Sequence, residues 1–206
     1  MIKIAVFIKP QKVIKKKILY LKQDVKKKLG AQPYLAHPPH CTLFTINVSE
    51  KILRYKKNLN SVTVDSKLNK EISIIKTDIF NNDPITGGKT IFFKIKKNIF
   101  LNKLQAKLLN KFSKYKKNKI GEKFKFKWMK KNNDNYGYPF VGKHWKPHFT
   151  IASLVNISND KKFINKFLNI KTKNNEKIKK IYVYKVKGDL HSYLWSINIK
   201  NEKQIS

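Results

Sequence analysis

The sequence contains one cysteine, one arginine and no long apolar segment among its 206 residues. The single cysteine, Cys41, excludes an intramolecular disulfide and any zinc site built from several cysteines. No apolar run approaches the length of about 20 residues that a transmembrane helix needs. The N-terminal stretch IKIAVFI is too short for a signal-peptide core and leads into a strongly charged helix. These absences predict a cytoplasmic protein without a membrane partner.

Acidic residues are also scarce. The chain has 12 Asp and Glu against 47 Lys and Arg, which gives a formal net charge of +35. Such a charge favours polyanions through counterion release. However, Arg54 is the only arginine, whereas proteins that recognise phosphate usually use the bidentate guanidinium group. The charge therefore allows an anionic ligand, but it also fits a compositional bias towards lysine.

A hydrophobic content of 41% and an aromatic content of 12% indicate a folded globular protein. Apolar periodicity and turn residues predict a mixed order of strands and helices. Strands are expected at 2–8, 40–48, 71–80, 89–96, 148–155, 180–186 and 190–199. Helices are expected at 11–29, from Ser49 to 58, after Asn98, and after Ser158 or Asn159. Because strand, helix and strand recur in both halves, we predict a single α+β domain, 1–206, built from two related halves.

Two short motifs, PPHCTLFTI at 38–46 and KPHFTIASL at 146–154, place His40 with Thr42 and His148 with Thr150. Residues i and i+2 of a strand face the same way, so each motif presents an imidazole and a hydroxyl on one side. Both motifs follow a proline and open an apolar strand, one in each half of the chain. If the two strands face each other, both pairs converge on one site.

Such a site suits phosphodiester chemistry. One neutral imidazole removes a proton from the attacking hydroxyl or water, and the other, as imidazolium, protonates the departing oxygen. Histidine can do both because its unperturbed pKa is about 6.5. The threonine hydroxyls can donate to the phosphate oxygens and hold them in place. This chemistry needs neither a metal nor an organic cofactor.

The two motifs resemble the signatures of the 2H phosphoesterase superfamily, which includes the bacterial 2′-5′ RNA ligases and 2′,3′-cyclic nucleotide phosphodiesterases. The resemblance implies a bilobal α+β fold with pseudo-twofold symmetry, in which two antiparallel sheets face each other across a central cleft and helices lie outside. It implies that His40 and His148 are the catalytic acid–base pair and that Thr42 and Thr150 bind phosphate. The arginines often found near the cleft in the RNA ligase branch have no obvious equivalents here.

Four other residues near the motifs are candidates for substrate binding. Tyr34, Tyr138 and Trp145 offer rings for base stacking, and Lys146 offers a charge for phosphate. For each of them, the sequence alone favours a packing or surface role over substrate binding. The remaining histidines lack a serine or threonine at i+2 and are interpreted as ordinary polar residues: His37, His144 and His191. A zinc site built from histidines of both motif regions lacks any supporting cysteine or carboxylate pattern, so no metal is expected.

We therefore predict a monomeric, metal-independent phosphoesterase. Its substrate is RNA or a small nucleotide, either with a 2′,3′-cyclic phosphate that is hydrolysed or with a 2′-5′ phosphodiester that is cleaved or joined. The alternative is a non-catalytic RNA-binding module that uses the same basic cleft. A small phosphodiester other than RNA is a further possibility that the sequence does not separate from the first.

Overall fold

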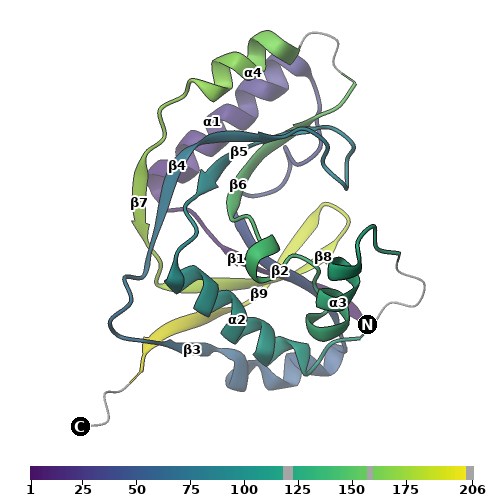
Figure 1. The fold of residues 1–206 in the computed structure, drawn as a ribbon, viewed down its shortest axis with the longest axis vertical. Helices are drawn as coiled ribbons and strands as arrows, with labels where there is room; N and C mark the ends of the chain where they lie inside the picture. The colour runs from purple at the N-terminus through teal and green to yellow at the C-terminus, as the bar shows by residue number, and fades with distance from the viewer. Residues whose placement is uncertain (118–122, 157–159, 203–206) are drawn as a thin grey trace.

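The computed structural model describes residues 1–117, 123–156 and 160–202. In this part of the chain the strands form two sheets, with helices on their outer sides (Figure 1). The strands are β1 (Ile2–Ile8), β2 (Cys41–Val48), β3 (Ser61–Val64), β4 (Glu71–Phe80), β5 (Lys89–Ile95), β6 (His148–Leu154), β7 (Asn174–Lys177), β8 (Lys180–Lys187) and β9 (Leu190–Asn201). The helices are α1 (Lys12–Leu29), η1 (Glu50–Leu59), α2 (Ile99–Ser113), α3 (Lys127–Tyr136), η2 (Gly142–His144) and α4 (Asp160–Leu168).

The first sheet has the strand order β2-β1-β8-β9-β3, and the first motif opens its edge strand β2. All neighbours are antiparallel except β3 and β9, which run parallel. The sheet is therefore antiparallel, as predicted, apart from this one edge pair. No hairpin turn joins β3 to β9, so the chain is free to approach β9 in the parallel direction.

The second sheet has the order β6-β5-β4-β7 and is antiparallel throughout. The second motif opens its edge strand β6, as the first motif opens β2. The two motif strands lie against each other, so the two sheets meet where the motifs begin. This arrangement brings together two segments that lie 108 residues apart in the sequence (His40 to His148).

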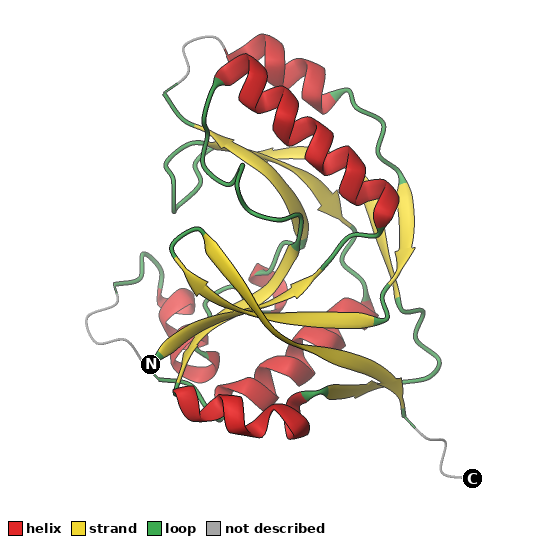
Figure 2. Ribbon diagram, turned by 180° about the vertical axis from the view of Figure 1, so that it is seen from behind, coloured by secondary structure: helices red, strands yellow, loops and turns green. Residues whose placement is uncertain are grey.

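Helices cover the outer side of each sheet, and both sheets lie between them (Figure 2). Helices α1 and α4 pack on the second sheet, whereas α2 packs on β2 and β3 of the first. Strand β1 therefore lies in one sheet while the helix that follows it covers the other, and each sheet contains strands from both halves of the chain. Because each sheet combines strands from both halves, the two halves form one structure. That they are two related halves of a single domain stays a prediction.

The predicted helix boundaries follow from their capping residues. The Asn98 side chain accepts a hydrogen bond of 2.8 Å from the Leu101 amide at the start of α2. Gly30, with a φ of 74°, ends α1. The Ser49 hydroxyl accepts from the Lys51 amide at the start of η1, which is a 3₁₀ helix. The predicted caps Ser158 and Asn159 lie outside the described residues.

No helix in the described part of the chain combines the length and apolarity that a membrane crossing requires. The apolar side chains instead gather in one large cluster between the sheets and their helices. Phe44 of β2 packs edge-on against Phe112 of α2, with ring centroids 5.5 Å apart. Phe93 of β5 packs parallel to Phe167 of α4 at 6.3 Å. Each of these pairs holds a helix against one of the two sheets that carry the motifs.

Candidate active site

The first motif holds His40 in a fixed orientation at the start of β2. Its Nδ1–H donates a hydrogen bond of 2.6 Å to the carbonyl oxygen of Pro38. Its ring is half-buried and stacks on Phe7 of the neighbouring strand β1, with centroids 3.8 Å apart. Because a carbonyl only accepts, Nδ1 carries the proton, and Nε2 of the neutral ring keeps its lone pair.

The second motif repeats this arrangement around His148. Its Nδ1–H donates to the carbonyl oxygen of Lys146 at 2.6 Å, again two residues earlier in the chain. Its half-buried ring packs against Phe92 of the neighbouring strand β5, with centroids 4.9 Å apart. Within the described residues, no protein group hydrogen-bonds to Nε2 of either motif histidine. Both Nε2 atoms are therefore available to a substrate.

The strand pairs around the motifs match each other in register. Thr42 lies opposite Phe7 across β1 and β2, and Thr150 lies opposite Phe92 across β5 and β6. A bulge directly follows in each pair, where β2 and β6 each carry one extra residue. The predicted alternation is confirmed, since both threonines are half-buried while the next residues are fully buried. No partner within the described chain occupies either threonine hydroxyl, so both can donate to a ligand.

Three contacts hold the two motif regions together. The Trp145 Nε1–H donates a hydrogen bond of 3.0 Å to the Thr42 carbonyl oxygen. Burial raises the pKa of the Cys41 thiol to about 12, and the backbone of His148 partly offsets this shift, which places Cys41 beside the start of β6. Gln105 of α2 donates from Nε2 to the Leu43 carbonyl oxygen at 2.8 Å and to the Phe140 carbonyl oxygen at 3.3 Å. Gln105 thus ties β2 to the loop before the second motif.

The surroundings of His40 are rich in positive and titratable groups. Burial lowers the pKa of His40 below its ordinary value of 6.5, against the hydrogen bond to Pro38. The neighbours His191, His37 and Lys22 lower it further. Each of these groups disfavours a positive charge on the ring. The neutral form of His40, which is the form a general base needs, is therefore favoured.

The surroundings of His148 differ because a carboxylate lies nearby. Burial lowers the pKa of His148, while the hydrogen bond to Lys146 and the negative charge of Asp83 oppose this shift. Asp83 is buried in the turn between β4 and β5, where its Oδ2 accepts from the Thr90 hydroxyl at 2.6 Å. The Tyr34 hydroxyl also donates to Oδ2, at 3.3 Å. Within the part of the chain that the structure describes, a carboxylate favours the protonated form of His148 but not that of His40.

Two histidines that sequence reasoning set aside lie beside His40. The ring of His191, at the start of β9, is 5.6 Å from that of His40, and the His37 ring is 6.3 Å from it. The His37 Nε2–H donates to Asp189 Oδ1 at 2.9 Å, and the His191 Nδ1–H donates to the Asp189 carbonyl oxygen at 3.0 Å. The loop before the first motif is thereby fastened to the turn between β8 and β9. No sequence spacing links these residues, because the sheet order creates the cluster.

The four candidate substrate-binding residues differ in their placement. Trp145 is only 3% exposed, and its indole N–H donates to the Thr42 carbonyl oxygen. This burial argues against base stacking on Trp145. Tyr138 is half-buried and packs on the core beside Phe140. Tyr34 lies between the two motif regions, since its ring is 5.4 Å from that of His37 and its hydroxyl contacts Asp83. Lys146 is exposed, and its Nζ lies 5.7 Å from the Phe80 ring.

The described residues contain no group of three or more His, Cys, Asp or Glu side chains that could hold a metal ion. The positive charge near the second motif comes instead from lysines. Lys94 lies directly opposite His148 across β5 and β6, and its Nζ is 3.2 Å from Asp78. Arg54 lies exposed on η1, outside the first sheet.

Comparison with known proteins finds relatives along the whole chain. Residues 4–193 match the family described as the AKAP7 2′5′ RNA ligase-like domain. No curated protein sequence matches the chain. The crystal structure of TT0787 of Thermus thermophilus is similar with a TM-score of 0.66 and 15% identity, over 98% of this chain and 100% of that chain.

Escherichia coli LigT in its apo form is similar with a TM-score of 0.56 and 11% identity, over 97% of this chain and 98% of that chain. The same protein complexed with 3′-AMP gives a TM-score of 0.52 and 11% identity, over the same shares of the two chains. At these identities the likeness concerns the fold. The predicted α+β fold of two sheets with helices outside is confirmed.

Proposed function

The chain belongs to the AKAP7 2′5′ RNA ligase-like family of the 2H phosphoesterase superfamily, and from that premise we propose that it acts on a phosphodiester of RNA or a nucleotide without a metal ion. It either hydrolyses a 2′,3′-cyclic phosphate or cleaves or joins a 2′-5′ phosphodiester. One observation carries the proposal. His40 and His148 have the same anchored Nδ1, and neither their Nε2 atoms nor the neighbouring threonine hydroxyls have a partner among the described residues. The likeness to E. coli LigT, which binds 3′-AMP, supports a nucleotide phosphate as the substrate.

The different surroundings of the two imidazoles support an assignment of their roles. His40, among positive and titratable neighbours, acts as the general base and takes the proton from the attacking water or hydroxyl through Nε2. His148, beside the charge of Asp83, acts as the general acid and gives its Nε2 proton to the departing oxygen. The proton gained by His40 and the proton lost by His148 balance over the reaction, and solvent exchange restores both rings.

The threonines and lysines then hold the phosphate. The hydroxyls of Thr42 and Thr150 donate to its non-bridging oxygens, so that the phosphorus lies between the two Nε2 atoms. Lys94 and Lys146 provide positive charge near the second motif for the charge that develops on those oxygens. The hydrogen bonds to Pro38 and Lys146 keep each ring in the tautomer that this chemistry uses.

The proposal is tested by turnover in the presence of a chelator. The substrates are 2′,3′-cyclic nucleotides, 2′-5′-linked dinucleotides and nicked RNA with cyclic ends. We expect His40→Ala and His148→Ala each to lower turnover by about 10²–10⁴-fold, the range for lost acid–base catalysis. Thr42→Val should weaken phosphate binding, whereas Thr63→Val, on the exposed side of β3, is the matched control that retains activity.

Unchanged folding of each variant is verified by circular dichroism, so that a loss of activity reports on chemistry. Full activity in either histidine variant, or activity only with added divalent metal, would overturn the assignment. Binding of RNA without turnover of any substrate, unaffected by loss of both imidazoles, would instead identify a non-catalytic RNA-binding module.

A further inference from the structure

A run of three parallel rings lies beside the second motif and takes no part in the chemistry above. Trp128 of α3 stacks on His144 of η2, with centroids 3.7 Å apart and ring planes 2° apart. On the same indole, Phe126 lies at 5.9 Å with its plane within 10° of that of Trp128. Phe126 remains 48% exposed. The run therefore ends in an aromatic ring that is open to solvent.

The inner part of this run has a structural explanation, but its outer end does not. Trp128 packs against His144 and, at 6.2 Å, against Phe140, so it fastens α3 to the loop before β6. Phe126 extends the run outward, and the helix does not need its exposed surface. A large apolar ring in this position is a stacking surface for another planar group.

The charges around the rings are almost all positive. The sequence alternates lysine and aromatic residues in KFKFKW at 123–128. The segment 123–144 carries six exposed lysines, Lys123, Lys125, Lys127, Lys130, Lys131 and Lys143. Its one acidic residue, Asp134, is paired with Lys130 at 2.7 Å. Lys125 places its Nζ 5.5 Å from the centroid of the Phe126 ring, so a positive charge and an aromatic ring are presented together.

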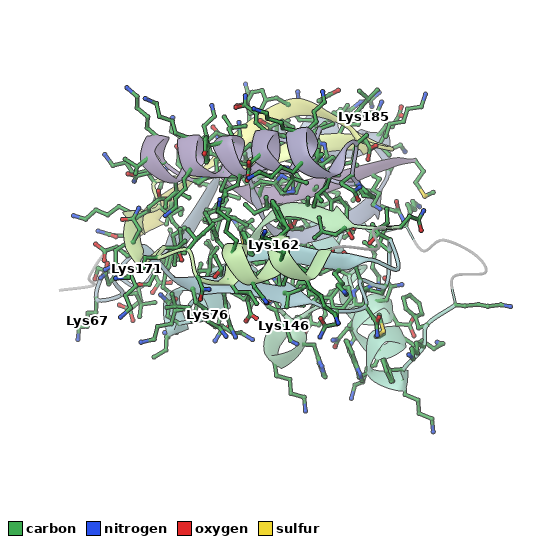
Figure 3. The ribbon with its side chains drawn as sticks, turned by 90° about the horizontal axis from the view of Figure 1, so that it is seen from above. Lys67, Lys76, Lys146, Lys162, Lys171 and Lys185 are labelled. Atoms are coloured by element: carbon green, nitrogen blue, oxygen red, sulfur yellow. The ribbon has the colours of Figure 1, made fainter. Side chains whose placement is uncertain are left out.

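Lysine density alone does not mark a site on this protein. Lysines project from many different elements, as the labelled Lys76 of β4, Lys162 of α4 and Lys185 of β8 illustrate (Figure 3). The distinguishing feature of the segment 123–144 is the combination of lysines with parallel, partly exposed rings. An acidic peptide would use only the charge, whereas a single-stranded nucleic acid uses both charge and stacking.

The aromatic run also lies close in sequence to the candidate active site. His144 and His148 are separated by four residue steps, which span at most about 14 Å of chain. A short oligonucleotide can therefore contact both the ring run and the second motif. We propose that Phe126, Trp128 and His144, with the lysines of 123–144, form a subsite that binds single-stranded RNA flanking the phosphate at the active site.

This inference deepens the proposed function, because it makes an RNA strand the substrate rather than a free nucleotide. Binding at this subsite should tolerate many sequences, because every base has a flat face for stacking and contacts to phosphates do not read the sequence. The exposed face of Phe126 receives one base, and the lysines contact the adjacent phosphates. The affinity should therefore fall as salt rises.

The test is the affinity of a short, fluorescently labelled, single-stranded oligoribonucleotide with ordinary hydroxyl ends, measured by anisotropy over a salt series. We expect Phe126→Ala to weaken binding by about 5- to 150-fold, the range for one stacked base, and Phe126→Trp to retain it. The matched control is Tyr20→Ala, which removes a 67% exposed ring among the lysines of α1. This control should bind like the natural chain.

The charge contribution is tested with a second matched pair. Lys127→Gln with Lys131→Gln should reduce the slope of log affinity against log salt by about 1.4, if each lysine contacts one phosphate. Lys12→Gln with Lys16→Gln, at the same spacing on α1, should leave the slope unchanged. The inference would be overturned if Phe126→Ala bound RNA as tightly as the natural protein, or if no RNA bound at all. It would also be overturned if Tyr20→Ala weakened binding as much as Phe126→Ala, or if the two double lysine variants changed the salt slope equally. Because the oligonucleotide needs no turnover, this result is independent of the proposed phosphoesterase activity.

Discussion

The indole nitrogen of Trp145 and the carbonyl oxygen of Thr42 are 3.0 Å apart, and this hydrogen bond joins the two motif regions. Trp145 precedes the second motif, whereas Thr42 carries a hydroxyl of the first. The bond is partly buried, with Trp145 only 3% exposed and Thr42 half-buried. The relative position of the two halves of the site therefore depends on a contact between the sheets.

Replacing Trp145 by phenylalanine should remove this contact while keeping an aromatic ring. We expect the free energy of unfolding to fall by about 1–3 kcal/mol, because the Thr42 carbonyl loses a buried partner. Turnover should also fall, since the two motifs are less firmly aligned. Urea denaturation and turnover of a 2′,3′-cyclic nucleotide measure the two effects.

Trp195→Phe is the matched control for this substitution. Trp195 is 7% exposed, and its Nε1 has no hydrogen-bond partner among the described residues. The control therefore loses indole volume but no hydrogen bond. If both variants lose the same stability, the contribution of the Trp145 hydrogen bond is refuted.

Much of this architecture could be predicted from the sequence where the apolar pattern is strong. The expected strands at 2–8 and 71–80 match β1 and β4 end to end, and the helix after Asn98 is confirmed. Helix α3 was missed because KWMKKNNDNY has a weak apolar face and four consecutive Asn and Asp residues. Strand β7, NNEK, was missed because its residues are typical of loops and its pairing with β4 is determined by the sheet.

The candidate site divides in the same way. The motif residues were predicted because i and i+2 on a strand share a face, a local rule that needs no knowledge of the fold. The cluster of His37, His191 and Asp189 was not, because it depends on the turn between β8 and β9 reaching the loop before β2. The burial of Trp145 could not be predicted for the same reason, since its indole N–H bonds to Thr42 of the other sheet.

The pH dependence of catalysis follows from the two imidazoles. The reactive form has a neutral His40 and a protonated His148, and kcat/KM reports the pKa values of the free enzyme. Both pKa values lie below the ordinary 6.5 because burial disfavours the charged rings. We therefore expect a bell-shaped profile of kcat/KM with its maximum below about pH 6.5. A maximum well above neutral pH would contradict this prediction.

Asp83→Asn should move one limb of that profile. The Asp83 carboxylate raises the pKa of His148 against the effect of burial, so its neutralisation should lower this pKa. The alkaline limb, where the general acid loses its proton, should shift to lower pH. Asp65→Asn, in the turn after β3, is the control and should leave the profile unchanged. Equal profiles for all three proteins would show that Asp83 does not act on His148.

Stability should also depend on pH in a defined direction. Burial lowers the folded-state pKa of His40, His148 and His191 below 6.5. Below about pH 6.5 the unfolded chain therefore binds more protons than the folded chain, and the free energy of unfolding decreases as the pH falls. Their contribution is complete above that pH and is lost progressively below it. Urea midpoints over a pH series measure this, and His40→Asn with His148→Asn should flatten the slope; a midpoint that rises on acidification would contradict the prediction.

Gly137 determines how the loop before the second motif leaves α3. Its φ is +71°, and a Cβ added there would lie 2.7 Å from Cγ1 of Ile46 in β2. Gly142 has a similar φ of +57°, but nothing lies within 4 Å of its added Cβ. Both substitutions to alanine incur the left-handed backbone penalty of about 1–2 kcal/mol, and only Gly137→Ala also forces the loop away from β2. We therefore expect Gly137→Ala to lose more stability than Gly142→Ala in urea denaturation, and equal losses would show that the close packing on Ile46 is unimportant.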